Sequence, residues 1–324
     1  MSIPFSARLP SALYSEPGAF LTIIPREVFI SSAYALFSGF ISLLVIAKNR
    51  GSYSEAAALS YFKDAEIITC DTFEDAFGSV GKSADHAFVP IENSIEGVVT
   101  QVCDLLLRKK LFVFGEGLLR IRHCLIANKG VRITDIKKVY SHPQALAQSR
   151  KYLEKIGAEL IPFSDTAKSV MMIKENKIMD SAGVASAYAA RLYGMEILKR
   201  NLESHSSNTT RFFAITDKNI KPEKARHVMN MKTSLGIMVK NAPGALYRAL
   251  GSLAQNGIDI TYLQSRPVPG KPGRSAFYME CRGSSGENRF ADALEDLRKH
   301  SESVKEIGSY LEGRGFLNDP KIDA

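Results

Sequence analysis

The chain has 324 residues and a formal net charge of +8, and 45% of its residues are hydrophobic and 23% charged. This length allows more than one hydrophobic core, and the composition excludes a disordered, collagen-like or disulfide-stabilised chain. Lysines and arginines are scattered without the basic stripe of a polyanion groove, so we expect no nucleic-acid partner. A positive cleft that captures a small dianion accounts for the charge equally well.

Cysteines and histidines give no sign of a metal or redox site. The four cysteines have no CxxC spacing, and the six histidines have no HExxH or similar ligand spacing. We therefore expect reduced thiols and predict no metal.

The N-terminal region contains an uncharged segment, residues 28–47, that is long enough to cross a bilayer as a helix. Several serines dilute its hydrophobicity, and its last part, Leu43–Ala47, is typical of a buried strand. We expect residues 1–41 to be a soluble extension of a cytoplasmic protein, with membrane association not expected. A targeting segment and a membrane anchor are the alternatives.

Strand and helix signals then alternate up to residue 217. Gly51 and Ser52 precede an alanine-rich run in the way a turn and a cap precede a helix. The later apolar runs expected as strands include 66–70, 87–91, 111–114, 120–127, 138–140 and 159–163. This alternation predicts an α/β fold with a largely parallel sheet, in which ligands bind beyond the carboxyl ends of strands.

Residues 218–231 are polar and contain Pro222, which indicates a linker. After it we expect strands at 233–239, 258–266, 275–281 and 304–310, with helices at 244–255 and 289–300. The order βαββαβ is the ferredoxin-like plan, so residues 232–314 are predicted to form an α+β domain followed by a tail, 315–324.

Three motifs place polar groups after or at the ends of strands. In the first, Asn93 and Ser94 directly follow a strand, and Thr100 comes about one helical turn later. Such groups gather where a ligand lies in an open α/β sheet. The alternative is an ordinary turn in which Asn93 and Ser94 cap the next helix.

The second motif joins a strand end to a helix through Ser141, His142, Pro143 and Gln144. Pro143 suits the first helical position, and the free N–H groups of that turn favour an anion. We expect Ser141 and Gln144 to hold a carboxylate. His142 is either a general base or a structural residue beside the cap.

The third motif, residues 208–213, enters a strand. Arg211 offers a planar fork suited to a carboxylate, and Thr210 offers a hydroxyl proton. The alternative for Thr210 is a β-prone residue in an ordinary strand.

Together with Gly51–Ser54, Ser164–Ala167 and the 185–194 segment, these motifs resemble prephenate dehydratase in order and spacing, from about Leu43 to the C-terminus. The resemblance implies loss of water and carbon dioxide from prephenate to give phenylpyruvate, without a cofactor. It implies that Thr210 is the catalytic residue. The side chains expected to bind or orient the prephenate dianion are Asn93, Ser94, Thr100, Ser141, Gln144, Asn208, Arg211 and Phe212.

The same resemblance implies a catalytic domain, 42–217, with two α/β lobes like those of type II periplasmic binding proteins. The first lobe is expected at about 42–118 and 200–217, and the second at about 119–199. One departure concerns the first loop, where Lys48 and Asn49 replace the usual Gly-Pro. This places the geometry of that loop in doubt.

The C-terminal domain resembles the ACT domain of prephenate dehydratases, which binds phenylalanine at a dimer interface. The residues that carry this resemblance are Gly244, Ala245, Leu246, Gln264, Ser265, Arg266 and Pro267. Gln264 stands where the family has an acidic residue and so lacks the charge that attracts an ammonium group. We expect phenylalanine as effector, with weaker feedback, and a homodimer or homotetramer.

Two other functions remain open at this point. Arogenate dehydratase acts on a substrate with an amino group in place of the keto oxygen, and these residues do not separate the two. A non-catalytic amino-acid-binding sensor is the alternative from another class, since a two-lobed fold also serves solute receptors.

Overall fold

The computed structural model describes residues 43–47, 49–220, 230–271, 273–313, 315–318 and 320. The predicted extension 1–41, most of the apolar segment 28–47, Lys48 and most of the linker lie outside the described residues. Within the described part of the chain, no helix is both long enough and apolar enough to span a membrane.

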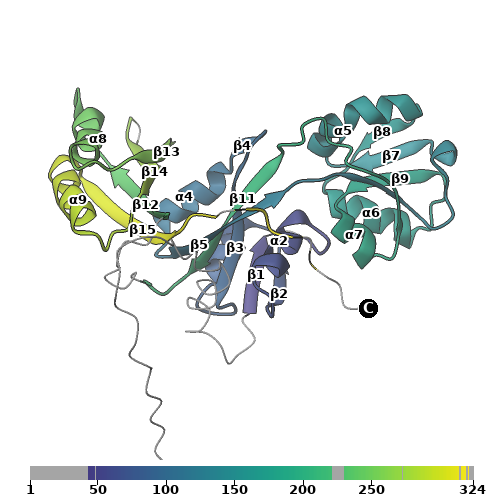
Figure 1. Cartoon of the computed structure of the whole chain (residues 1–324), viewed down its shortest axis with the longest axis horizontal. Helices are drawn as coiled ribbons and strands as arrows, with labels where there is room; N and C mark the ends of the chain where they lie inside the picture. Colours follow the sequence, from purple (N-terminus) through teal and green to yellow (C-terminus); the bar gives the residue numbers. More distant parts are fainter. Residues whose placement is uncertain are drawn as a thin grey trace, which may run out of the picture. The chain divides into compact units, whose positions relative to one another are not determined.

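Three sheets organise the described residues (Figure 1). The first lobe contains a sheet in the order β2-β1-β3-β11-β5, with β4 paired to β3. Its strands are β1 (Leu43–Ala47), β2 (Glu66–Cys70), β3 (His86–Asn93), β4 (Gly97–Val98), β5 (Phe112–Arg120) and β11 (Thr209–Thr216). Its helices are α2 (Tyr53–Tyr61), α3 (Phe73–Ser79) and α4 (Thr100–Arg108). Ser52 caps α2 as expected, because its hydroxyl accepts the Glu55 N–H at 3.2 Å.

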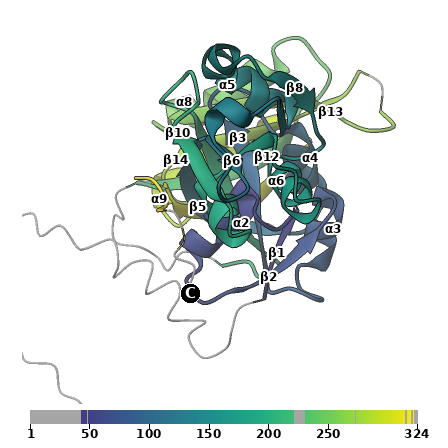
Figure 2. The same ribbon diagram turned by 90° about the vertical axis from the view of Figure 1, so that its right-hand side faces the viewer.

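The second lobe, which faces the viewer in Figure 2, is built on a sheet in the order β10-β6-β9-β7-β8. Its strands are β6 (Cys124–Ala127), β7 (Lys138–Ser141), β8 (Glu159–Pro162), β9 (Ser181–Ala185) and β10 (Glu196–Arg200). Its helices are α5 (Pro143–Ile156), α6 (Thr166–Glu175) and α7 (Ala187–Leu192). The chain passes between the lobes at 121–123 and 201–208, slightly later than predicted at both crossings.

The two-lobed α/β prediction is confirmed, but the prediction of a largely parallel sheet is wrong. Strand β11 is antiparallel to both β3 and β5, and β6 is antiparallel to both β9 and β10. The reason is connectivity: the chain leaves the first lobe through β5 and returns through β11, so these neighbouring strands run in opposite directions. Among the strands of these two sheets, parallel pairing is confined to β1, with β2 and β3 as its neighbours, and to β7, with β8 and β9 as its neighbours.

The C-terminal domain, residues 231–311, confirms the ferredoxin-like prediction. Its elements are β12 (Met231–Met238), α8 (Ala245–Gln255), β13 (Ile260–Pro267), β14 (Ser275–Arg282), α9 (Asn288–His300) and β15 (Ser303–Leu311). The antiparallel sheet has the order β13-β14-β12-β15. A core that includes Leu235, Leu253 and Phe290 joins the sheet to its two helices.

The same sheet also packs against the first lobe. Tyr278, Ile307 and Tyr310 belong to one buried hydrophobic cluster with Val113 and Phe213 of the first lobe. The C-terminal domain is therefore part of the first lobe's core. Burial of this apolar surface is the main force that holds the two together.

The described part of the predicted tail continues this contact. The Leu317 N–H donates to the Leu118 carbonyl at 2.7 Å, and the Arg120 guanidinium lies 4.4 Å from the centroid of the Phe316 ring. Figure 1 shows this yellow segment running from β15 past β5 toward α2. It extends the contact between the C-terminal domain and the first lobe.

Gly308 lies where β15 meets β5, and a Cβ atom there would stand 2.0 Å from the Val113 carbonyl oxygen. We expect Gly308→Ala to force the two strands apart and to destabilise the protein by roughly 2 kcal/mol or more. Thermal unfolding followed by circular dichroism measures this.

Gly251→Ala is the matched control, because nothing lies within 4 Å of a Cβ at Gly251, inside α8. It should keep or raise stability, by up to about 1 kcal/mol. If Gly308→Ala unfolds at the same temperature as wild type, β15 and β5 do not approach so closely.

Candidate active site

Asn93 and Thr210 face each other across the neighbouring strands β3 and β11. The Asn93 side-chain oxygen accepts the N–H groups of Ile95 and Glu96 at 2.9 and 3.0 Å, which fixes the orientation of its amide. Its nitrogen therefore points the other way and donates to the Thr210 hydroxyl oxygen at 3.0 Å. The hydroxyl proton of Thr210 is left for another acceptor.

Asn208 extends this pair toward the second lobe. Its side-chain oxygen accepts from Asn93 at 2.9 Å, and its nitrogen donates to the Gln148 side-chain oxygen at 2.9 Å. Asn208 is buried, and Gln148 belongs to α5 of the second lobe. The hydrogen bonds that orient Thr210 therefore reach across both lobes.

Glu96 also joins the lobes. It follows β3, and its carboxylate accepts from Gln144 at 2.7 Å and from Gln148 at 3.3 Å. The two glutamines lie four residues apart on one face of α5. Glu96, Gln144 and Gln148 thus hold the end of β3 against the start of α5.

His123 lies on the chain crossing between the lobes and is buried. Its Nε2 is 2.8 Å from the Gln148 oxygen, which also accepts from Asn208, so Nε2 is the protonated nitrogen of the neutral ring. Burial lowers the pKa of His123, against the opposing hydrogen bond to Gln148. The Tyr53 hydroxyl lies 2.8 Å from Nδ1 and 2.9 Å from the Arg122 carbonyl.

Other predicted site residues lie near this network. The Ser94 hydroxyl donates to the Ser207 carbonyl at 3.1 Å and accepts the Thr209 N–H at 3.0 Å. Thr100 is the first residue of α4 and is partly exposed. His142 is the N-cap of α5, and its Nδ1 accepts the backbone N–H of Gln144 at 3.4 Å. This contact supports the structural alternative for His142.

Two predicted carboxylate ligands, Ser141 and Arg211, are corrected by the structure. The Ser141 side chain is fully buried and donates to the Val184 carbonyl at 2.5 Å, because the end of β7 packs beside β9. Arg211 lies next to Thr210 in a strand, and successive side chains of a strand point to opposite faces. Arg211 therefore cannot reach a ligand bound at Thr210.

Phe212 and Arg266 also have roles other than those predicted. Phe212 is buried and stacks on Phe88, with ring centroids 5.3 Å apart, so it belongs to the core rather than to a substrate surface. Arg266 forms a two-bonded pair with Asp104 of α4, at 2.7 and 2.9 Å, so its guanidinium joins the C-terminal domain to the first lobe. A contact between Arg266 and an effector is disfavoured.

Arg211 instead belongs to a buried ion cluster at the junction of the first lobe and the C-terminal domain. Its guanidinium contacts Glu92 at 3.1 Å, Glu116 at 3.1 Å and Glu280 at 2.7 Å. Lys232 lies 3.3 Å from Glu116 and 3.6 Å from Glu280. Burial opposes the Arg211 charge, but Glu280 and Glu116 raise the pKa of Arg211 well above its usual value.

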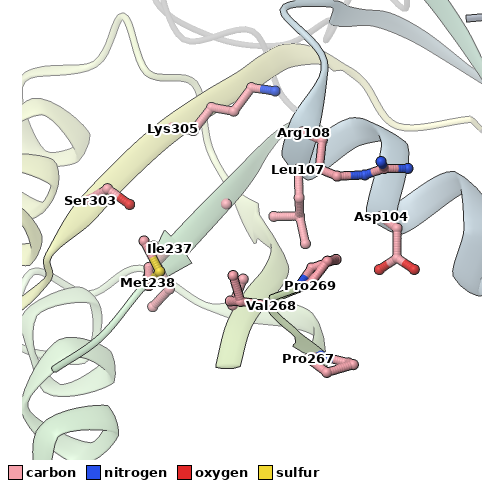
Figure 3. A pocket seen from close by; sticks show the side chains of 12 residues that line it. Asp104, Leu107, Arg108, Ile237, Met238, Pro267, Val268, Pro269, Ser303 and Lys305 are labelled. Carbon is pink, nitrogen blue, oxygen red and sulfur yellow. The ribbon is translucent and has the colours of Figure 1, made fainter. Parts of the chain in front are cut away.

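A cavity of about 340 Å³ lies at the same junction, between α4 and the sheet of the C-terminal domain. Figure 3 shows Leu107 and Val268 among its apolar lining, with Lys305 at one side. The Lys305 ammonium donates to the Leu106 carbonyl at 2.5 Å, and burial lowers the pKa of Lys305 to about 8. The residues that line this cavity are separate from the Thr210 network.

Sequence reasoning missed Gln148, His123 and the carboxylates around Arg211. Gln148 had a usable signal, because it lies one helical turn beyond Gln144 and so shares its face of α5. His123 had none, since a single histidine between two strands has no spacing to interpret. Its partners Tyr53 and Gln148 come from distant parts of the chain.

The fold and the network together define a two-lobed α/β protein with a polar site between its lobes and a ferredoxin-like domain attached. Residues 48–220 match the family model described as prephenate dehydratase. That match covers more than half of the chain. The chain belongs to the prephenate dehydratase family.

Named relatives agree with this assignment. Arogenate dehydratase 2 of Petunia hybrida is 37% identical over 282 residues, which span 82% of this chain and 71% of that protein. The bifunctional chorismate mutase/prephenate dehydratase of Aquifex aeolicus is 34% identical over 298 residues, spanning 89% and 80%.

Solved structures agree as well. Prephenate dehydratase of Arthrobacter aurescens in complex with L-Phe is 29% identical, with a TM-score of 0.77 over 83% of this chain and 90% of that one. A structure described as GqqA, a novel type of quorum quenching acylase, is 33% identical, with a TM-score of 0.78 over 83% and 97%.

The ion cluster predicts a pH dependence of stability. Burial raises the pKa of Glu116 above its ordinary value of 4.5, although Arg211 and Lys232 act in the other direction. The folded state therefore holds the Glu116 proton more tightly than the unfolded state, and this contribution to stability is lost as pH rises through the raised pKa. Glu116→Gln, which stays neutral, should gain stability relative to wild type as the pH rises above about 5.

Urea unfolding of both proteins across this range measures the difference. Glu74→Gln is the control: the exposed Glu74 carboxyl has its pKa lowered by Lys109, so its difference from wild type should stay constant above pH 5. A pH-independent difference for Glu116→Gln would show that Glu116 is ionised throughout.

Proposed function

We propose that this chain catalyses the decarboxylative dehydration of prephenate to phenylpyruvate. The hydrogen bond from Asn93 to the Thr210 hydroxyl oxygen is the observation that carries the proposal. Because Thr210 accepts this bond, it offers its proton outward, to the hydroxyl group that leaves the substrate ring. A donor aimed at an oxygen that gains negative charge stabilises the transition state more than the ground state.

The rest of the reaction follows from the substrate's own chemistry. The ring carbon–oxygen bond breaks while the ring carboxylate leaves as carbon dioxide, and the electrons of the broken carbon–carbon bond complete the aromatic ring. A threonine hydroxyl is a weak acid, so Thr210 acts mainly as a hydrogen-bond donor that assists hydroxide departure. Asn93, Asn208 and Gln148 hold that donor in one orientation.

The side chains left to recognise the dianion are fewer than predicted from sequence. Thr100 offers a hydroxyl beside the network, and Ser94 and Gln144 are exposed there. A bound substrate would take the Ser94 hydroxyl from the Ser207 carbonyl and the Gln144 amide from Glu96. We keep these residues as the proposed substrate contacts. Ser141, Arg211 and Phe212 support the site from inside the protein.

Arogenate is the second candidate substrate, and the names of the relatives favour it. Proteins of Petunia hybrida and Arabidopsis thaliana at 34–37% identity are named arogenate dehydratase or arogenate dehydratase/prephenate dehydratase. Both substrates have the same leaving hydroxyl and the same departing carboxylate. The Thr210 network therefore serves either reaction, and a side-by-side assay separates them.

Thr210→Ala should lower kcat by about 10²–10³-fold on the better substrate, because the donor to the departing oxygen is lost. Thr210→Ser keeps the hydroxyl and should retain most of the activity. Steady-state assays with prephenate and arogenate, following phenylpyruvate and phenylalanine, measure these values.

Thr209→Ala is the matched control for this series. Thr209 is the adjacent threonine of β11, and its hydroxyl donates to the Ser207 carbonyl, so its loss should leave kcat within about twofold of wild type. Near-normal turnover by Thr210→Ala would remove the proposed role. An absence of turnover with both substrates would favour a non-catalytic sensor.

For the C-terminal domain we propose an ACT-type effector site for phenylalanine at an interface between two copies of the chain. Strand β13 forms an edge of the sheet, and Gly244, the N-cap of α8, has a φ of +74°. Tyr247 on α8 is 81% exposed and Leu263 on β13 is 41% exposed. Large apolar side chains exposed beside an open strand edge are suited to a second subunit.

This proposal assigns the effector contacts to Gly244, Ala245, Leu246, Gln264, Ser265 and Pro267, and the assembly to a homodimer or homotetramer. The relative from Arthrobacter aurescens was solved with L-Phe, which supports phenylalanine as the ligand class. We also propose a cytoplasmic location, although several relatives from Arabidopsis thaliana are named chloroplastic.

Isothermal titration with L-phenylalanine should give a saturable signal, and Gln264→Glu should tighten binding by about tenfold through the added charge opposite the ammonium group. Gln255→Glu, an exposed glutamine at the end of α8, is the matched control and should leave the affinity unchanged. Absence of heat at millimolar phenylalanine in wild type and in Gln264→Glu would exclude this form of regulation.

A further inference from the structure

Strand β11 carries Thr210, and its next residue, Arg211, contacts the C-terminal domain. Thr210 and Arg211 are neighbours in β11, with side chains on opposite faces of the sheet. The Thr210 face belongs to the Asn93 network, and the Arg211 face belongs to the ion cluster. A displacement of the Arg211 side chain therefore acts on the backbone that positions the Thr210 hydroxyl.

Glu280 provides the contact from the other domain. Both of its carboxylate oxygens accept from one terminal nitrogen of Arg211, at 2.8 and 2.7 Å. The carboxylate is 1% exposed, and the Tyr278 hydroxyl donates to it at 3.1 Å, so Glu280 is itself fixed within β14. These are the shortest contacts that Arg211 makes with a carboxylate in the described cluster.

The pairing of β11 with β3 is irregular next to Arg211, so the contact between Arg211 and Glu280 affects the strand. The pairing of β11 with β3 shifts between Arg211 and Phe212: Arg211 pairs with Glu92, whereas Phe212 pairs with Pro90. The extra residue, Ile91, lies two positions before Asn93, which is the partner of Thr210. A bulge re-aims nearby side chains, and its geometry needs support from its surroundings. The fork of Arg211 supplies that support, since it holds Glu92 of β3 and Glu280 of β14 together.

We infer that Glu280 of the C-terminal domain is a positioning residue for the dehydration reaction, acting through Arg211 on the strand that carries Thr210. This inference rests on the proposed function. It makes the C-terminal domain part of the machinery that orients the active-site hydroxyl, in addition to the effector role proposed for it.

The first test compares two identical chemical changes in the same ion cluster. Glu280→Gln removes the charge that holds Arg211, whereas Glu312→Gln removes a carboxylate that contacts Lys232 at 3.5 Å and Arg282 at 3.7 Å. We expect Glu280→Gln to lower kcat on the order of tenfold, with KM within about twofold. Glu312→Gln should keep the wild-type kcat.

The second test separates positioning from loss of folded protein. If Glu280 acts through the Thr210 hydroxyl, Glu280→Gln lowers kcat in the wild-type background and has no further effect in a Thr210→Ala background, measured at high enzyme concentration. A smaller folded fraction lowers the rate by the same factor in both backgrounds. If Glu280→Gln does not fold, Arg211→Lys provides the same comparison, because lysine keeps the buried positive charge and loses the fork.

The outcomes separate this inference from the proposed function. An active wild type with a Glu280→Gln kcat equal to that of Glu312→Gln would overturn the inference and leave the proposed function intact. Equal losses in the wild-type and Thr210→Ala backgrounds would also overturn it. A wild type without activity on prephenate or arogenate contradicts the proposed function, and the inference with it.

Discussion

Strand β11 has two faces with different tasks, and the rest of the molecule depends on this division. Side chains of a strand alternate between its faces, so a hydroxyl and a guanidinium at consecutive positions serve opposite sides of one sheet. On one side Thr210 completes a network that reaches the second lobe. On the other, Arg211 joins the first lobe to the C-terminal domain.

The ion cluster around Arg211 specifies how the C-terminal domain docks. Moving several charges out of water costs more free energy than their mutual attraction supplies, unless each charge keeps good hydrogen-bond partners. A buried ion cluster is therefore weak evidence for stability. The packing of Tyr278, Ile307 and Tyr310 against the first lobe supplies the apolar burial. The cluster adds selectivity, because a shifted domain would leave Arg211 or Lys232 buried without a carboxylate.

Much of the fold was predictable because its signals are local. The Ser52 cap, the proline at the start of α5 and the βαββαβ order follow from short-range patterns, and the structure shows each of them. The direction of β11 was not predictable in this way. It depends on the chain leaving the first lobe through residues 112–120 and re-entering it through residues 209–216, and these two distant segments determine the strand direction only together.

The candidate site was also predictable only in part, where its signals are local. Asn93, Asn208, Gln144 and Thr210 were predicted from motifs at strand ends, and the structure joins them through direct bonds or through Glu96 and Gln148. Ser141 and Arg211 were assigned to substrate from their chemistry and their place at strand ends. Their partners, Val184 and Glu280, could not be named without the fold. A side chain of suitable chemistry becomes a ligand only where the topology leaves it free. In this chain the same guanidinium that suits a substrate carboxylate suits Glu280, and the alternation of β11 decides between them.

Strand β14, which carries Glu280, is paired with β13, where Gln264 lies opposite Tyr278. An effector bound at β13, as proposed, would lie one strand from Glu280, the residue that contacts Arg211.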